Sequence, residues 1–212
     1  MAILPLFIPP ITAIAIIALP IVVTNLQQLL SEKNWREIVY RYKYMACFML
    51  LASFLSSQLL TQISVELISA VIGFALALFA IYSLFNFTIP VTAHPAWQIL
   101  AGASSGLLSG ITGIQSTAII YFASLNISKN EFVGGVGYIF LIGGLGLTIG
   151  LLNNNLLNSS TGMLSLFGVL FSVVGFKLGS LLRPYIHSEL FKKLLFLLML
   201  IIGMKQIYQF FW

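Results

Sequence analysis

The chain of 212 residues is 59% apolar and only 7% charged, whereas an ordinary globular domain is roughly 25% charged. It contains no aspartate, and its ten bases against five acids give a formal net charge of +5. So few charges cannot cover the surface of a soluble domain of this size, which excludes a soluble enzyme and makes the lipid bilayer the main partner of the chain. The bases stand at segment ends and not in a cluster with aromatic side chains, so we expect no nucleic-acid partner.

Seven apolar segments follow one another along the chain, and each is long enough to cross a bilayer as a helix. Their approximate limits are 11–30, 38–60, 65–85, 95–125, 132–152, 162–182 and 189–211. Only the fourth segment is interrupted by polar residues in its middle. We therefore predict an all-α, polytopic transmembrane bundle that forms a single integral membrane domain over residues 1–212.

The bases between the segments predict how the chain crosses the membrane. The connections 31–43 and 183–193 are basic, while the connections after residues 60 and 152 carry no base. Lysine and arginine accumulate on the cytoplasmic side of membrane proteins. Both basic connections lie on that side only if segment 95–125 enters the membrane and returns, so we predict that this segment is broken and re-entrant.

The chain also contains a weak internal repeat. Gln27-Gln28-Leu29-Leu30 resembles Asn154-Asn155-Leu156-Leu157, and Ser64-Val65-Glu66-Leu67 resembles His187-Ser188-Glu189-Leu190. With a re-entrant fourth segment the two sets of helices run in opposite senses, as in the inverted repeats of secondary transporters. Residues 1–90 are then an incomplete first repeat and residues 91–212 a second one. The counterpart of segment 95–125 falls before Met1, so we expect a missing N-terminal segment.

The interruption in the fourth segment is the strongest candidate for a solute site. Gly102, Gly106 and Gly110 recur every four residues, which suits either close helix packing or exposed backbone. The stretch that follows is rich in glycine and polar residues, which a helix tolerates at membrane depth where it breaks and faces a cavity. The predicted substrate-binding residues of this stretch are Ser109, Gly110, Thr112, Gly113, Gln115, Ser116 and Thr117.

A second half-helix is expected to begin near Ser116, with that residue as its N-cap. Its first amides would be free, and a helix N-terminus is a natural site for an oxyanion. Thr24 and Asn25 of the first segment are predicted to add hydrogen-bond donors to the same cavity. Lys205 is open to two interpretations, a role in transport or a side chain that snorkels to the interface. No catalytic or metal-binding pattern is present, so we expect neither enzymatic activity nor a cofactor.

The sequence around the break resembles a known family. Gly106-Leu107-Leu108-Ser109-Gly110-Ile111-Thr112-Gly113-Ile114, continuing to Ile119-Ile120-Tyr121-Phe122, is similar to the second signature of the TauE/SafE sulfite exporter family. Asn130-Glu131-Phe132 and residues 20–26 are similar too. Two features depart from the family pattern: its first Gly-rich broken helix has no counterpart here, and Ser116-Thr117 stands where a Gly-Pro pair is usual.

The resemblance implies a multi-pass permease of the bacterial plasma membrane that moves sulfite, organosulfonates or other small anions. In the mechanism we expect, an anion reaches the midplane, is held by unwound backbone and hydroxyl groups, and leaves as the two repeats rock. The alternative is a truncated or structural membrane protein without transport activity of its own. A structural subunit of this kind would need a partner chain. For either function, a homo-oligomer or a missing N-terminal segment stays open.

Overall fold

The computed structural model describes residues 3–85, 90–182 and 188–211. Within these ranges the chain forms nine α-helices and two short 3-10 turns, and no strand, which confirms the predicted all-helical class. The elements are η1 (Leu4–Leu6), α1 (Pro10–Leu30), α2 (Trp35–Arg41), α3 (Lys43–Ser57), η2 (Gln58–Thr61), α4 (Val65–Phe85), α5 (Pro95–Thr112), α6 (Ser116–Ser124), α7 (Lys129–Asn153), α8 (Ser159–Leu182) and α9 (Ser188–Phe211).

Four elements are long and apolar enough to cross a membrane: α1, α3 together with η2, α4 and α7. Their apolar length follows from uninterrupted runs of aliphatic and aromatic residues, because a helix rises about 1.5 Å per residue and the hydrocarbon core is about 30 Å thick. In α8 and α9 the described residues contain shorter apolar stretches, Ser159–Gly175 and Phe196–Tyr208. The chain is thus a multi-pass membrane protein by its helices, and the number of seven segments remains a prediction.

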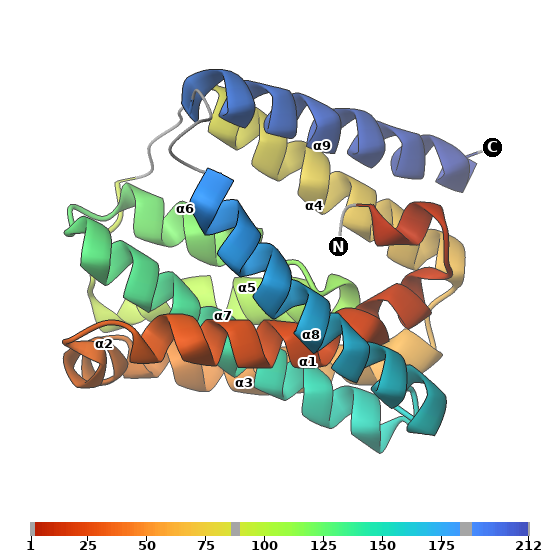
Figure 1. The fold of residues 1–212 in the computed structure, drawn as a ribbon, viewed down its shortest axis with the longest axis horizontal. Coiled ribbons are helices and arrows are strands. Elements are labelled where there is room, and N and C mark those ends of the chain that lie inside the picture. The colour runs from red at the N-terminus through yellow and green to blue at the C-terminus, as the bar shows by residue number, and fades with distance from the viewer. Residues whose placement is uncertain (1–2, 86–89, 183–187, 212) are drawn as a thin grey trace.

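The second predicted segment was expected to be one helix from about residue 38, and this expectation is wrong. The chain forms the short helix α2, turns at Tyr42 with φ −106° and ψ 22°, and begins α3 at Lys43. Tyr42 is fully buried, its hydroxyl donates to Glu131 Oε1 at 2.8 Å, and its ring lies edge-on to Phe122. These contacts anchor the turn, so α2 lies across the end of α1 and α3 (Figure 1, left, where α2 is seen nearly end-on).

Helix α7 forms the centre of the bundle and is the most buried of the four candidate spans. Its glycines permit this position because they let neighbouring helices approach to backbone contact. A Cβ atom on Gly146 would lie 2.7 Å from the carbonyl oxygen of Leu50 in α3, and one on Gly144 would lie 2.7 Å from Ile21 Cγ2 in α1. The glycines of this segment therefore serve tight packing.

The three regularly spaced glycines of α5 also pack against a neighbouring helix. A Cβ atom on Gly102 would collide with the carbonyl oxygen of Met45, and one on Gly106 would lie 2.7 Å from the carbonyl oxygen of Met49. Gly110 faces the backbone of the same helix, α3, at Ser53. Of the two interpretations of this stripe, the structure therefore supports close packing, which holds α5 rigidly along α3.

The fourth predicted segment enters the bundle and returns. In Figure 1, α5 runs from the left end into the bundle and α6 runs back to the left end, where α7 begins. Two hydrogen bonds show the same return: Ala118 N donates to Ser105 Oγ at 3.1 Å, and Tyr121 Oη donates to the carbonyl oxygen of Thr92 at 3.0 Å. The predicted break and reversal of this segment are therefore present in the fold.

The other helices alternate in direction. In Figure 1, α1, α4 and α8 run towards the left end, whereas α3, α7 and α9 run away from it. These are the directions that an inverted repeat of α1–α3–α4 and α7–α8–α9 requires, although the repeat itself and the proposed boundary near residue 90 remain predictions. The basic residues of the α1–α3 connection lie at this left end, which we call the basic end.

Candidate functional site

The interruption between α5 and α6 is a true break in the helix. Helix α5 ends at Thr112, and Gly113 follows in the left-handed conformation with φ 69°, where its amide donates to the carbonyl oxygen of Ser109 at 2.7 Å. Glycine suits this position because a residue with a Cβ atom is strained at positive φ. Helix α6 begins at Ser116 as predicted, but the N-cap position belongs to Gln115, whose side chain makes no capping hydrogen bond.

The first amides of α6 are only partly satisfied. The first N–H groups of any helix have no partner within that helix. The amide of Ala118 is bonded to Ser105, and the amide of Ile114 donates to Thr112 Oγ1 at 3.0 Å. The amides of Ser116 and Thr117 have no hydrogen-bond partner among the described residues. The N-terminus of α6 therefore presents free donors and partial positive charge inside the bundle.

Unpaired polar side chains gather around the same break. Ser109 Oγ, Gln115 Oε1 and Thr117 Oγ1 are buried without a hydrogen-bond partner. Ser109 is completely buried, and Gln115 is 4% exposed. In the rest of the described chain only Gln98 and Gln206 contain such atoms. Since more than nine in ten buried polar groups are paired in folded proteins, three orphaned groups within nine residues indicate a place for water or a polar ligand.

The remaining predicted residues of this stretch are held by local contacts. Thr112 Oγ1 donates to the carbonyl oxygen of Leu108 at 2.7 Å, and Gly110 is pressed against α3 as described above. The side-chain amide of Gln115 donates to the carbonyl oxygen of Phe140 at 3.4 Å, near the middle of α7. Ser116 is buried in the first turn of α6. The uncommitted polar atoms of the stretch are thus the hydroxyl groups of Ser109 and Thr117, which can donate, and Gln115 Oε1, which can only accept.

Thr24 and Asn25 lie on α1 and are not brought to the break by any hydrogen bond. Thr24 Oγ1 donates to the carbonyl oxygen of Pro20 at 2.6 Å, and Asn25 Nδ2 donates to the carbonyl oxygen of Ile21 at 2.7 Å. The α1 side chain nearest to a Cβ on Gly113 is that of Ile17. Ile17 precedes Thr24 by seven residues, which corresponds to about 10 Å along the helix. A substrate-binding role for Thr24 and Asn25 therefore remains a prediction without a contact to support it.

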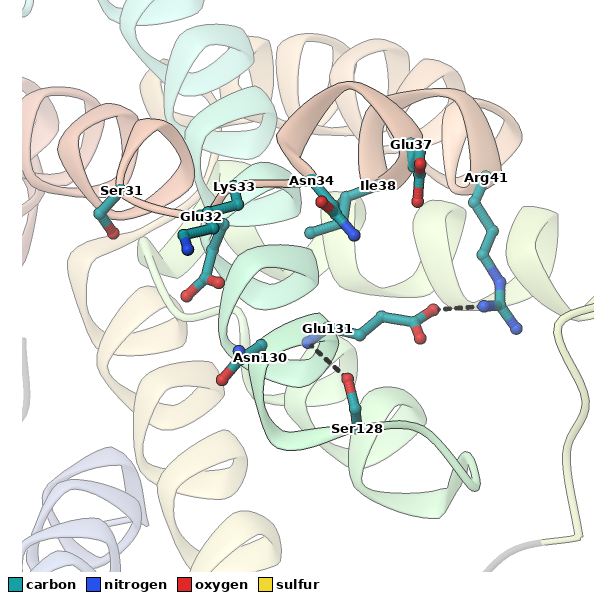
Figure 2. Close-up of a pocket in the computed structure, with 10 residues that line it drawn as sticks. All are labelled: Ser31, Glu32, Lys33, Asn34, Glu37, Ile38, Arg41, Ser128, Asn130 and Glu131. Carbon is teal, nitrogen blue, oxygen red and sulfur yellow. Dashed lines mark hydrogen bonds and ion pairs between the residues drawn. The ribbon is translucent and has the colours of Figure 1, made fainter.

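Sequence reasoning missed a second polar feature, a cavity at the basic end. Its volume is about 640 Å³, and it lies between the end of α1, α2 and the start of α7 (Figure 2). Its lining residues are Ser31, Glu32, Lys33, Asn34, Glu37, Ile38, Arg41, Ser128, Asn130 and Glu131. Because most of these side chains are polar or charged, the cavity suits water and small hydrophilic solutes.

An ion pair crosses this cavity and ties α2 to α7. Arg41 Nη1 lies 2.6 Å from Glu131 Oε1, which also accepts the hydroxyl of Tyr42 (Figure 2 shows the ion pair). Ser128 caps α7 by accepting the amide of Glu131 at 3.2 Å. Burial, and then the neighbouring carboxylate of Glu131, raise the pKa of Tyr42, so this hydroxyl stays protonated and remains a donor.

The signal for this cavity was present only in part. Glu131 belongs to the Asn130-Glu131-Phe132 sequence that resembles the family, but Arg41 looked like one of several bases that orient the chain in the membrane. The two residues are brought together by the packing of α2 on α7, which no local pattern predicts. Lys205, the other charged candidate, is exposed on α9.

Comparison with known proteins agrees with the broken helix and the apolar bundle. The sequence matches the family model described as "Sulfite exporter TauE/SafE" over residues 1–206. No curated protein and no solved structure matches the chain. The family is one of membrane transporters, and the match covers nearly the whole sequence, including the break, both halves of the fourth segment and the cavity at the basic end. The chain therefore belongs to the sulfite exporter TauE/SafE family.

Proposed function

We propose that this protein is a permease of the bacterial inner membrane that exports small anions, with sulfite, organosulfonates and related sulfur oxyanions as its substrate class. The observation that carries the proposal is the α5–α6 break. There the free N-terminal amides of α6 coincide with the unpaired hydroxyl groups of Ser109 and Thr117. A site of this composition binds oxygen atoms that carry negative charge.

The chemistry of these groups suits transport rather than tight retention. Hydroxyl, amide and backbone N–H groups donate hydrogen bonds to an oxyanion without a full opposite charge. Each of these bonds is charge-assisted, because the acceptor is an anion, but no full positive charge stands beside the anion to add an ion pair, so the anion can be released. Sulfite and sulfonate groups each offer three oxygen atoms, which matches a cluster of several donors arranged around one helix terminus.

The cavity at the basic end fits the same proposal as the inner access to the site. It lies at the end of the bundle where the positive-inside rule places the cytoplasm. Its two bases, Lys33 and Arg41, stand among three acids, Glu32, Glu37 and Glu131, so an anion gains there only by replacing a glutamate as the partner of a base. In the present conformation Arg41 is engaged by Glu131. We propose that an arriving anion competes with Glu131 for Arg41 before it moves towards the break.

Anion flux in reconstituted vesicles tests this function. The purified protein is placed in liposomes loaded with sulfite, an organosulfonate or thiosulfate, and efflux is compared with that from empty liposomes. The Thr117→Val variant keeps the shape of the side chain but loses its hydroxyl group. One hydrogen bond to a charged group is worth about 1.5–3 kcal/mol, so flux should fall about ten- to hundredfold. Thr61→Val, at an exposed position in η2, is the matched control and should transport normally.

Two results would overturn the proposal. Wild-type protein that releases none of these anions faster than empty liposomes would favour a membrane protein without transport activity of its own. Equal flux by the wild type and the Thr117→Val variant would show that transport does not use the broken helix.

A further inference from the structure

Helix α2 has two chemically different faces. Glu37, Ile38 and Arg41 line the cavity at the basic end. Arg36 and Tyr40, which lie one helical turn apart, do not line it and are both exposed. Since residues four apart lie on the same side of a helix, Arg36 and Tyr40 form a face that points away from the cavity.

The start of α3 extends this face. Lys43 Nζ lies 4.3 Å from the ring centre of Tyr40 and 5.2 Å from that of Tyr44. Lys43 and Tyr44 are both exposed. We define the outer face of α2 as Arg36, Tyr40, Lys43 and Tyr44. It combines two bases with two aromatic rings on neighbouring turns.

The two bases on this face have no acidic partner. Among the described residues the one ion pair joins Arg41 to Glu131, across the cavity. Arg36 lies over the ring of Trp35 with its guanidinium carbon 5.3 Å from the ring centre. Contact with an aromatic ring holds a cation in position without neutralising its charge, so Arg36 and Lys43 remain available to an anion outside the protein.

The position of α2 determines which anion that is. The helix connects the ends of two candidate membrane spans and lies across them in Figure 1. A short helix in this position lies along the membrane surface, at the depth of the phospholipid headgroups. Tyrosine and tryptophan favour the same depth because they have an apolar body and a polar tip. Tyr40 is 73% exposed, so its outer side is free to meet the headgroup layer.

We propose that the outer face of α2 binds the phosphate group of an anionic phospholipid. The Arg36 guanidinium presents paired N–H donors to phosphate oxygens, Lys43 adds a second positive charge, and the hydroxyl groups of Tyr40 and Tyr44 donate hydrogen bonds at the same level. This inference rests on the membrane location of the chain and goes beyond the proposed anion transport. Each base near an anionic membrane surface strengthens binding about fivefold, so the pair accounts for about thirtyfold.

A zwitterionic lipid fits this face less well. The choline group of phosphatidylcholine carries a positive charge next to its phosphate, which opposes the approach of Arg36 and Lys43. Phosphatidylglycerol has no such charge. The proposal therefore predicts enrichment of phosphatidylglycerol around α2, and it predicts that high salt weakens the enrichment because exposed charges are screened.

Fluorescence of Trp35 tests the proposal directly. In a Trp97→Phe, Trp212→Phe background Trp35 is the remaining tryptophan of the chain. The protein is placed in nanodiscs of phosphatidylcholine and phosphatidylglycerol in which either lipid, at equal content, carries brominated acyl chains that quench nearby tryptophan. We expect stronger quenching when the brominated lipid is phosphatidylglycerol, and we expect high salt to remove the difference.

Two variants separate this surface from general charge effects. In the Arg36→Gln, Lys43→Gln variant, Trp35 fluorescence should be quenched equally by either brominated lipid. The Lys129→Gln variant loses an exposed base at the same end of the bundle, outside the outer face of α2, and should keep the difference. Thermal unfolding of both variants in detergent checks that they are folded, which is expected because all three side chains are exposed.

Three results would overturn the proposal: equal quenching by the two lipids in the parent protein, an unchanged difference in the Arg36→Gln, Lys43→Gln variant, or loss of the difference on adding soluble phosphate when sodium chloride of the same ionic strength leaves it intact. The last result would identify the face as a site for free phosphate. Because the readout is lipid proximity, a failure here leaves the anion-flux result unaffected, and a failure of anion flux leaves this proposal unaffected.

Discussion

Replacing Ser109 with alanine removes one hydroxyl group from the broken helix and should make the protein more stable but less active. Ser109 is completely buried and its hydroxyl has no partner. The backbone carbonyl of Ser109, which accepts the amide of Gly113, is unaffected by the substitution. A structural role and a transport role for this hydroxyl group therefore predict different results.

The magnitude follows from the state of the hydroxyl group. An unsatisfied buried polar group costs about 1–3 kcal/mol, and alanine favours a helix over serine by up to about 0.7 kcal/mol. The free energy of unfolding of Ser109→Ala should therefore rise by about 1–3 kcal/mol. In a chain of this size each kcal/mol moves the melting temperature by about 2–4 °C. Anion flux should fall about ten- to hundredfold, because the charged substrate loses one hydrogen bond of about 1.5–3 kcal/mol.

Two neighbouring serines provide the controls. Ser105 Oγ accepts the amide of Ala118, which also donates to the carbonyl oxygen of Gln115 at 3.2 Å, so Ser105→Ala removes one of two acceptors and should lower stability by about 0.5–1.5 kcal/mol. Ser104 is exposed, and Ser104→Ala should leave both flux and stability nearly unchanged. Thermal unfolding in detergent and efflux from liposomes are measured on the same preparations. A Ser109→Ala variant that is less stable yet transports at the wild-type rate would refute the assignment of Ser109 to the anion site.

Three further predictions concern the surrounding structure. Tyr42→Phe should lower stability at neutral pH by about 1.5–3 kcal/mol, because Tyr42 donates to the ionised Glu131. The pKa of Tyr42 is raised in the folded state, so the contribution of its hydroxyl is complete below the ordinary tyrosine value of about 10 and is lost at higher pH. The difference in melting temperature between the wild type and Tyr42→Phe should therefore narrow above about pH 10. A difference in melting temperature that stays constant with pH would contradict the reasoning. Gly106→Ala should cost about 1–3 kcal/mol because its Cβ meets the α3 backbone, while Gly162→Ala, with open space around it, should be neutral or slightly stabilising in the same assay. Gly113→Asn should retain more stability than Gly113→Val, since asparagine tolerates positive φ and a β-branched residue does not; equal melting temperatures would show that the left-handed conformation is not required.

The structure also limits which substitutions can test the transport site. Leucine at Gly110 or Gly113 would appear from sequence alone to block the cavity without affecting insertion. In the fold, Gly110 is pressed against the backbone of α3, so a larger side chain there would separate two packed helices. Loss of flux in such a variant would report on packing. Removal of single hydroxyl groups from Ser109 and Thr117 avoids this ambiguity.

Composition and local pattern were sufficient for the membrane environment, the helical class and the position of the break. The low charge content leaves no soluble alternative, and backbone hydrogen bonding in lipid requires helices. The stretch 109–117 could be located because glycine and polar residues interrupt an apolar run there, but the whole stretch was expected to be unwound, and the structure keeps all of it helical except residues 113–115. The limits of α1 and α4 agree with the predicted ones to within one residue for the same reason, since they depend on uninterrupted local hydrophobicity.

The tertiary structure alone decided what each polar or glycine residue of these segments does. Regular spacing could not distinguish a glycine that contacts α3 from one that opens a site, because both need a bare backbone. Nor could it show that Thr24 bonds to its own helix, while Ser109 is left without a partner. The contact of Arg41 with Glu131 joins residues 90 positions apart, and only the packing of helices far apart in the sequence brings such charges to one cavity.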